Sequence, residues 1–124
     1  MIEKEHIIDA VVCKGNETVL EVSRILRDTQ RRHIIVINDM DKPIGLISTV
    51  DLNNRVIAEG KNVNETLAEN IMTPDIKYVN LNSSYKEAFE IMAELGTFSI
   101  PVVENEKIIG LLEFNTAFKI KRDE

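Results

Sequence analysis

Apolar residues recur at helical spacing in two segments of the chain, residues 19–26 and residues 85–95. Each segment follows a hydroxyl residue that has a glutamate three positions further on, a pattern typical of a helix N-terminus. The two patterns begin at Thr18 and Ser84, 66 residues apart, which indicates a duplicated unit. We therefore predict two equivalent helices with one buried face each. These faces comprise Val19, Val22, Ile25 and Leu26 in the first helix, and Tyr85, Ala88, Phe89, Ile91, Met92 and Leu95 in the second.

Short apolar runs bounded by turn residues surround both helices and predict strands. The run at residues 33–37 is almost continuously β-branched, which indicates a strand that is covered on both faces. Pro43 should stand at the start of the next strand, because a proline cannot donate to a sheet ladder. The expected strands are residues 9–13, 33–37, 43–47, 76–79, 98–103 and 107–112.

Three further helices are expected between and after these strands. The first is residues 50–59, ended by Gly60, and the second is residues 62–71, broken by the sequence Met72-Thr73-Pro74-Asp75. The third begins at about Asn115. The order strand, helix, strand, strand, helix thus occurs twice and predicts an α/β fold of two repeats, residues 1–61 and 62–124.

Composition places the chain among globular proteins and narrows its partners. Its 124 residues are 44% hydrophobic and 29% charged, enough for one compact unit or two small ones. The net charge of −6 argues against general affinity for nucleic acid or an anionic membrane. No apolar run approaches the roughly 20 residues that span a bilayer. The start lacks a secretory signal pattern and the single cysteine, Cys13, can form no internal disulfide, so we expect a cytoplasmic protein.

The stretch Gly45-Leu46-Ile47-Ser48-Thr49-Val50-Asp51 runs from a buried strand directly into a helix. It should place Ser48 and Asp51 at one helix N-terminus, beside free backbone N–H groups. The hydroxyl could bind a phosphate oxygen, and the carboxylate could accept hydrogen bonds from two ribose hydroxyls. The alternative is purely structural: Ser48 or Thr49 caps the helix and Asp51 complements its dipole.

This repeated pattern resembles the CBS domain family, and the whole chain resembles one CBS pair, also called a Bateman module. The resemblance is carried by Ile71-Met72-Thr73-Pro74, by the segment from Gly96 to Val103, and by the stretch from Gly45 to Asp51. It implies a pseudo-two-fold pair with two clefts between the repeats. In many members of the family these clefts bind adenosine compounds such as AMP, ADP, ATP or S-adenosylmethionine.

The family's ligand motif is glycine, two apolar residues, threonine or serine, any two residues, and aspartate. Ser48 and Asp51 keep it in the first repeat, whereas the second repeat has Glu113 and Thr116. A carboxylate at Glu113 would repel phosphate, so we expect the second cleft to be weak, empty or specialised. The resemblance implies that the first cleft is lined by Arg32 as the phosphate cation and by Leu46, Ile47, Ser48, Thr49, Asp51, Met72, Lys77, Phe98, Ser99 and Ile100.

Three residues of this region have simpler explanations. Phe98 fits a core position, because aromatic side chains are usually buried. Arg32, next to Arg31, fits a solvated surface equally well. His33 aligns with Ser99 and could touch the second cleft, but it also fits a hydrogen-bonded strand end.

No histidine, cysteine or carboxylate set has the spacing of a metal or catalytic site, so we expect neither an enzyme nor a metal. The expected function is a regulatory module that senses an adenosine compound and signals to an unidentified partner protein. The alternative is an interaction or scaffold module that binds no nucleotide. The resemblance also implies a homodimer joined through helices, on which a lone module would leave apolar residues partly exposed. These residues are Leu52, Val56, Ile57, Phe118 and Ile120.

Overall fold

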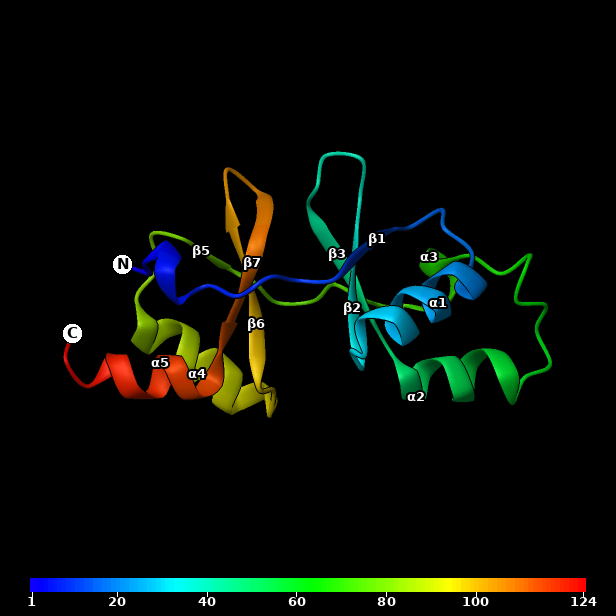
Figure 1. Ribbon diagram of the computed structural model, residues 1–124. Helices are drawn as coiled ribbons and strands as arrows, with labels where there is room; N and C mark the ends of the chain where they lie inside the picture. Colours follow the sequence, from blue (N-terminus) through cyan, green and yellow to red (C-terminus); the bar gives the residue numbers. More distant parts are fainter. The chain divides into compact units, whose positions relative to one another are not determined.

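A computed structural model describes residues 1–124, which form two compact units (Figure 1). The first-repeat unit comprises Val11–Ile76, and the second-repeat unit comprises Met1–Ala10 together with Lys77–Glu124. These units differ from the consecutive repeats 1–61 and 62–124. The first ten residues fold onto the second repeat, and residues 62–76 stay with the first. The mixed α/β architecture and its duplication agree with the prediction.

The first-repeat unit contains a four-stranded sheet in the order β1-β2-β3-β4. β1 is parallel to β2, and the other pairs are antiparallel. β4 was expected only as a helix break, yet Pro74 pairs with Gly45 and Thr73 with Leu46. A proline fits there because β4 is an edge strand. The strands are β1 (Val12–Lys14), β2 (His33–Ile37), β3 (Pro43–Ser48) and β4 (Thr73–Pro74).

Three helical segments complete this unit: α1 (Val19–Thr29), α2 (Thr49–Leu52) continued by the π-helical turn η2 (Asn53–Ile57), and α3 (Ala68–Ile71). The helix predicted at residues 62–71 is therefore wrong over its first six residues. Asn62 Oδ1 accepts from the N–H of Asn64 at 2.8 Å, and the hydroxyl of Thr66 donates to Asn62 O at 2.8 Å. Such local bonds give the backbone an alternative to a helix.

The core of the first-repeat unit lies between its sheet and its helices. Ile34 and Val36 of β2 pack in this core with Val22 of α1, and Ile35 and Ile37 on the opposite face of β2 are also buried. This confirms a strand covered on both faces. The buried core residues are Cys13, Val19, Val22, Leu26, Ile34, Val36, Ile47, Val56, Ala68 and Ile71.

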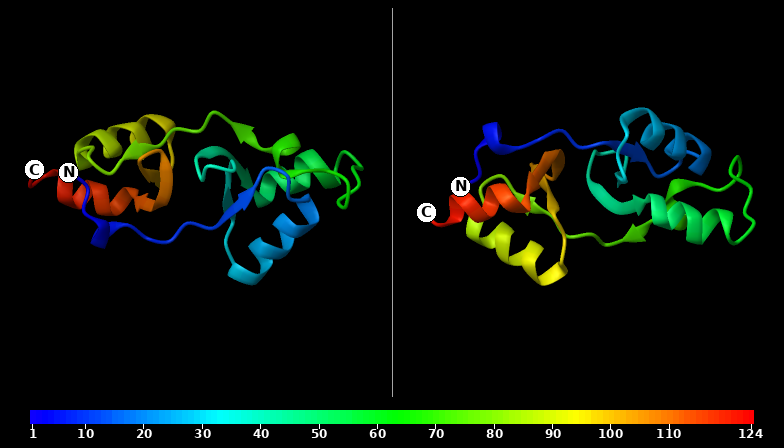
Figure 2. Two further views of the ribbon diagram at one scale, coloured as in Figure 1. Left: turned by 90° about the horizontal axis from the view of Figure 1, so that it is seen from above. Right: turned by 60° about the horizontal axis from the view of Figure 1, so that its bottom comes forward.

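The second-repeat unit has a three-stranded sheet with α4 and α5 side by side on it (Figure 2). Phe89 of α4 contacts Phe114 and Phe118 of α5 edge to face, at centroid distances of 5.0 and 5.7 Å. Leu95, predicted to be buried, is 50% exposed because it lies in the last turn of α4, beyond Met92. The elements are η1 (Lys4–His6), β5 (Val79–Asn80), α4 (Tyr85–Leu95), β6 (Ser99–Glu104), β7 (Lys107–Glu113) and α5 (Phe114–Lys121).

The N-terminal segment is anchored within the second-repeat unit. The side chain of Ile2 is 1% exposed and belongs to the core of that unit. The hydroxyl of Tyr85 accepts from the N–H of Glu3 at 2.8 Å and lies 2.6 Å from Nδ1 of His6. Ile8 then bridges to Leu111, so the segment runs beside β7 (Figure 1).

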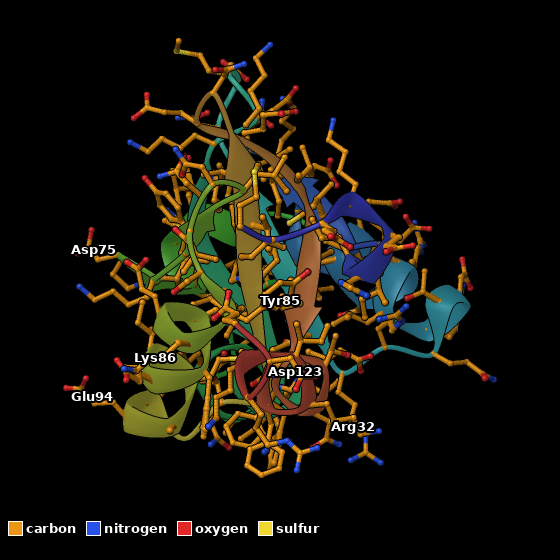
Figure 3. The ribbon with its side chains drawn as sticks, turned by 90° about the vertical axis from the view of Figure 1, so that its left-hand side faces the viewer. Arg32, Asp75, Tyr85, Lys86, Glu94 and Asp123 are labelled. Carbon is orange, nitrogen blue, oxygen red and sulfur yellow. The ribbon has the colours of Figure 1, made fainter.

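The predicted helix caps are confirmed at Thr18 and Ser84, whose hydroxyls accept from the N–H three residues further on. Neither glutamate returns the bond, so neither helix start is a complete capping box. At α4 the carboxylate of Glu124 accepts instead from the N–H groups of Tyr85 and Lys86, at 2.8 Å each. Figure 3 shows Lys86 on α4 and Asp123 at the end of α5.

Candidate functional site

The predicted ligand motif lies where β3 passes into α2. Ser48 is the N-cap of α2, its Oγ accepts from the N–H of Asp51 at 3.1 Å, and Asp51 Oδ2 accepts from the N–H of Ser48 at 2.9 Å. This is a complete capping box, so the predicted capping role of Ser48 is confirmed. The N–H groups expected to be free are also partly used, because Thr49 N donates to Arg32 O at 3.0 Å.

The carboxylate of Asp51 still has capacity for an outside donor. Its side chain is 19% exposed, and its second oxygen, Oδ1, lies 3.6 Å from Nη2 of Arg55. A carboxylate offers about four lone-pair sites, of which the hydrogen bond from the N–H of Ser48 occupies one, while Arg55 lies at ion-pair distance. The capping box therefore fixes the orientation of Asp51 without exhausting it as an acceptor.

Two basic residues lie beside this helix start. His33 is the ladder partner of Ser48 across β2 and β3, and Arg32 precedes it. Both side chains are exposed, and the structure gives neither side chain a hydrogen bond (Figure 3 labels Arg32). The sequence interpretation of His33 as a hydrogen-bonded strand end is therefore wrong. The strand register could have predicted that His33 lies beside Ser48, because two strands joined by a tight turn place these residues opposite each other.

The other predicted residues of the first-repeat unit divide by burial. Ile47 is fully buried in the core, which leaves only its backbone atoms for a ligand. Leu46 is half-buried, and Thr49 is exposed. Met72 packs against Gly45, and a Cβ on that glycine would collide with Met72 Sδ. Gly45 is thus required for the close approach of the segment that follows α3.

The remaining predicted residues belong to the second-repeat unit. Phe98 is 85% exposed, so its interpretation as a core residue is wrong. Lys77 is exposed and Ser99 half-buried, whereas Ile100 is 2% exposed within the core and has only backbone atoms to offer. A cleft that combines these residues with the first repeat stays a prediction.

The corresponding helix start of the second repeat has the same backbone and different side chains. Phe114 N donates to Phe98 O at 2.8 Å, as Thr49 N does to Arg32 O. Glu113 occupies the N-cap of α5 but makes no capping bond, and Thr116 stands in place of the aspartate. An exposed carboxylate therefore replaces the serine hydroxyl at this end.

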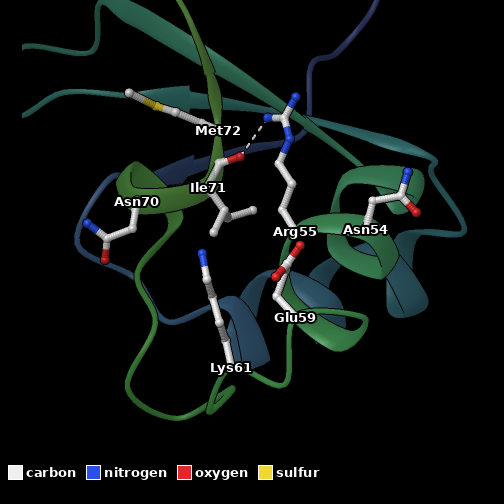
Figure 4. Close-up of a pocket in the computed structure, with 7 residues that line it drawn as sticks. All are labelled: Asn54, Arg55, Glu59, Lys61, Asn70, Ile71 and Met72. Carbon is white, nitrogen blue, oxygen red and sulfur yellow. Dashed lines mark hydrogen bonds between the residues drawn. The ribbon is translucent and has the colours of Figure 1, made fainter.

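A separate open pocket of about 320 Å³ lies between η2 and α3 of the first-repeat unit (Figure 4). Arg55 forms part of its wall, and its Nη1 donates to Ile71 O at 2.8 Å and to Thr73 Oγ1 at 3.1 Å. Met72 is the one predicted ligand residue that lines it. The other lining residues are Asn54, Arg55, Glu59, Lys61, Asn70 and Ile71.

One group of side chains has ligand atoms close enough for a metal ion: Glu3, Glu5 and His6, whose atoms lie within 4.8 Å of one another. Both glutamates are exposed, and His6 Nδ1 is already 2.6 Å from the Tyr85 hydroxyl. We assign no metal to this group, which was not singled out from the sequence.

None of the helices has both the length and the apolar character needed to cross a membrane.

Known proteins resemble the chain over most of its length. An uncharacterized protein of Methanopyrus kandleri is 28% identical over 114 residues, which cover 91% of this chain and 58% of that protein. The chain spans only about a fifth of several other curated relatives.

Solved structures give the same result. A conserved protein of Pyrococcus horikoshii has a TM-score of 0.72 at 27% identity, covering 96% of this chain and 90% of that one. The cytosolic domain of the Mg²⁺ channel MgtE, solved in complex with ATP, has a TM-score of 0.75 at 25% identity, covering 90% and 44%. The profile of the CBS domain matches residues 5–58 and again residues 68–119. With both repeats matched, the chain belongs to the CBS domain family and is a CBS pair.

Proposed function

We propose that this CBS pair is a regulatory module that binds one adenosine compound at the helix start formed by Ser48 and Asp51. AMP, ADP, ATP and S-adenosylmethionine are the candidates. The observation that carries the proposal is the carboxylate of Asp51, which the capping box holds in place while 19% of the side chain remains exposed. The related MgtE domain in complex with ATP supports this ligand class.

Each polar group at this end has a distinct task in the proposal. Asp51 accepts from the ribose hydroxyls through its remaining lone pairs. Ser48 Oγ accepts from Asp51 N, so its own hydrogen is free to be donated to a phosphate oxygen. Arg32 places positive charge near that oxygen, because its carbonyl accepts from the N–H of Thr49 at the same helix start.

The family resemblance supplies the rest of the proposed site. The adenine ring would contact Met72 and Lys77, together with the backbone at Phe98, Ser99 and Ile100. Glu113 makes the corresponding site of the second repeat unfavourable for phosphate, so one ligand per chain is proposed. The bound state would be passed to a partner protein.

A thermal-shift screen tests the proposal. A ligand that binds only the folded state raises the midpoint of unfolding, by an amount that grows with its concentration. We expect at least one of AMP, ADP, ATP and S-adenosylmethionine to do so, and Asp51→Ala to abolish the shift while Thr116→Ala preserves it. A chain that responds to none of them would favour the scaffold function without nucleotide.

We also propose that the chain pairs with a second copy through its helices. Val50 and Ile57 of α2 and η2 are 62% and 63% exposed, and Phe118 of α5 is 45% exposed. Val56 does not belong to this surface, contrary to prediction, because it is 1% exposed in the core. Leu52 and Ile120 are half-buried. Light scattering should give twice the chain mass of 14.1 kDa at micromolar concentration, and the single mass would contradict pairing.

A further inference from the structure

Arg55 joins two parts of the first-repeat unit that are far apart in sequence. It stands one helical turn after Asp51, with its Nη2 3.6 Å from Asp51 Oδ1. Its Nη1 donates to Ile71 O at 2.8 Å, the bond drawn in Figure 4, and to Thr73 Oγ1 at 3.1 Å. The same guanidinium therefore contacts the proposed ribose acceptor and the segment that leaves α3.

That segment, Ile71–Pro74, is held by Ile71 in the core and by Met72 against Gly45, and Arg55 makes the only side-chain hydrogen bonds to it. The carbonyl of Ile71 lies in the last turn of α3, where carbonyl groups lack helical partners, and Arg55 supplies a donor for it. β4 pairs with β3 through two residues only. Beyond Ile76 the chain passes into the second-repeat unit at Lys77. Arg55 is thus a main side-chain attachment of the stretch that connects the two units.

The other charged groups near this position do not replace Arg55. Glu59 and Lys61 line the same pocket, but the structure gives neither of them an ion pair or a side-chain hydrogen bond. A guanidinium can contact a carboxylate and a carbonyl simultaneously through its planar fork of donors. A lysine has no such fork and could not replace it.

We propose that Arg55 is a positioning residue that couples occupancy of Asp51 to the order of the segment Ile71–Pro74. This coupling rests on the proposed function. When ribose hydroxyls bind the Asp51 carboxylate, whose orientation the capping box already fixes, the neighbouring guanidinium loses freedom, so its bonds to Ile71 and Thr73 cost less further ordering. Linkage makes the effect reciprocal: loosening the segment must weaken the ligand by the same factor.

The test is amide hydrogen exchange of the whole chain, alone and with saturating AMP, ADP, ATP or S-adenosylmethionine in turn. In the parent, nucleotide should slow exchange both at residues 48–52 and at residues 71–76. In Arg55→Gln, exchange at residues 71–76 of the free protein should be roughly 3- to 10-fold faster, the effect of losing a partly exposed charged hydrogen bond. Nucleotide should then protect residues 48–52 only, with affinity lowered by a similar factor.

Two further variants sharpen the test. Arg24→Gln on α1 removes an exposed arginine whose single ion-pair partner is Glu21 at 4.0 Å, and it should behave as the parent does. Arg55→Lys keeps the charge beside Asp51 but not the fork. We expect it to recover part of the nucleotide affinity without restoring ligand-dependent protection at residues 71–76.

The outcomes separate this coupling from the proposed function. A parent that binds none of AMP, ADP, ATP and S-adenosylmethionine would overturn both. A parent that binds nucleotide, with the same protection at residues 71–76 in Arg55→Gln, would overturn the coupling alone. Equal changes in Arg24→Gln would also overturn it, because the effect would then follow from net charge.

Discussion

The two units cover their motif glycines with different pieces of the chain. In the first-repeat unit Met72 packs over Gly45, and in the second-repeat unit Ile7 and Ile8 pack over Gly110. The covering residues 7 and 72 are separated by the same 65 residues as the two glycines. Each repeat is therefore completed by the stretch that precedes the other repeat in sequence. The motif glycine permits this close approach of the chain.

The helix starts that follow these glycines have diverged in side chains only. In both units the first N–H of the helix donates to a carbonyl that directly precedes a strand. Thr49 N donates to Arg32 O before β2, and Phe114 N donates to Phe98 O before β6. The capping box of Ser48 and Asp51 has no counterpart at Glu113. The two helix starts thus share a backbone arrangement and differ in the side chains that cap them.

The glycines should give the largest difference between the units. Gly110 has φ of 153° and its Cβ would meet the backbone carbonyl of Ile8, whereas a Cβ at Gly45 would meet the flexible end of Met72. We expect Gly110→Ala to lower the free energy of unfolding by about 3 to 4 kcal/mol and Gly45→Ala by about 1 to 2 kcal/mol, measured by urea denaturation.

Matched double variants identify the cause of each loss. Met72→Ala should absorb most of the cost of Gly45→Ala, because it removes the obstructing side chain. Ile7→Ala should not rescue Gly110→Ala, because the backbone strain and the Ile8 carbonyl remain. Similar losses of unfolding free energy in Gly110→Ala and Gly45→Ala would contradict the difference between backbone contact at Gly110 and side-chain contact at Gly45.

Ligand affinity should show the second largest difference. Losing a hydrogen bond to a charged group costs about 1.5 to 3 kcal/mol, so Asp51→Ala should weaken nucleotide binding by roughly 10- to 150-fold in isothermal titration. Thr116→Ala should change the affinity little. Circular dichroism of each variant checks that the fold is kept, and a greater loss in Thr116→Ala would move the working site to the second repeat.

The strands β1 and β5 differ by one ionisable residue, which should make the stability of the first-repeat unit depend on alkaline pH. Cys13 in β1 and Val79 in β5 pair with Val36 and Val102 at equivalent positions, and burial raises the pKa of the Cys13 thiol from 9.0 to about 12. Between these values the unfolded chain loses the thiol proton while the folded chain retains it, so stability falls as pH rises. The loss should be about 1.4 kcal/mol at pH 10.

Cys13→Val gives the first repeat the residue of the second and provides the control. Its free energy of unfolding at pH 7 should lie within about 1 kcal/mol of the parent, because the change nearly conserves volume. Urea denaturation at pH 7 and pH 10 should show a smaller decrease for this variant. Equal decreases would mean that the thiol is ionised in the folded protein.

Exchanging the helix caps should give the smallest effect. Ser48→Ala should lower the free energy of unfolding by about 1 kcal/mol, because it removes one capping acceptor. Glu113→Ser should raise it by about 0.5 kcal/mol, because it adds a side chain that can cap α5. Thermal unfolding of both variants measures the difference, and a stabilising Ser48→Ala would contradict the assigned cap.

Sequence reasoning succeeded where local patterns decide the structure. The caps Thr18 and Ser84 and the helix stop at Gly96 follow from short-range chemistry, and the structure has all three. It failed where distant segments meet. The pairing of Pro74 with Gly45 depends on tertiary contacts that no local pattern records.

The candidate site shows the same division. Asp51 and Ser48 were found because their motif is contiguous, and their capping box was already the simpler expectation. Arg55 was missed because its partners, Ile71 and Thr73, lie 16 and 18 residues further along the chain. The exposure of Phe98 was missed because aromatic character alone predicts burial.

Each motif glycine is covered by a segment that precedes the other repeat in sequence, so the smallest unit that can fold completely is the pair and not the single repeat. A half chain ending at residue 61 would lack Met72 and β4, and β3 would become an open edge of exposed N–H and C=O groups. Such an edge invites pairing with other chains and aggregation. Loss of either half would therefore uncover the motif glycine of the other half.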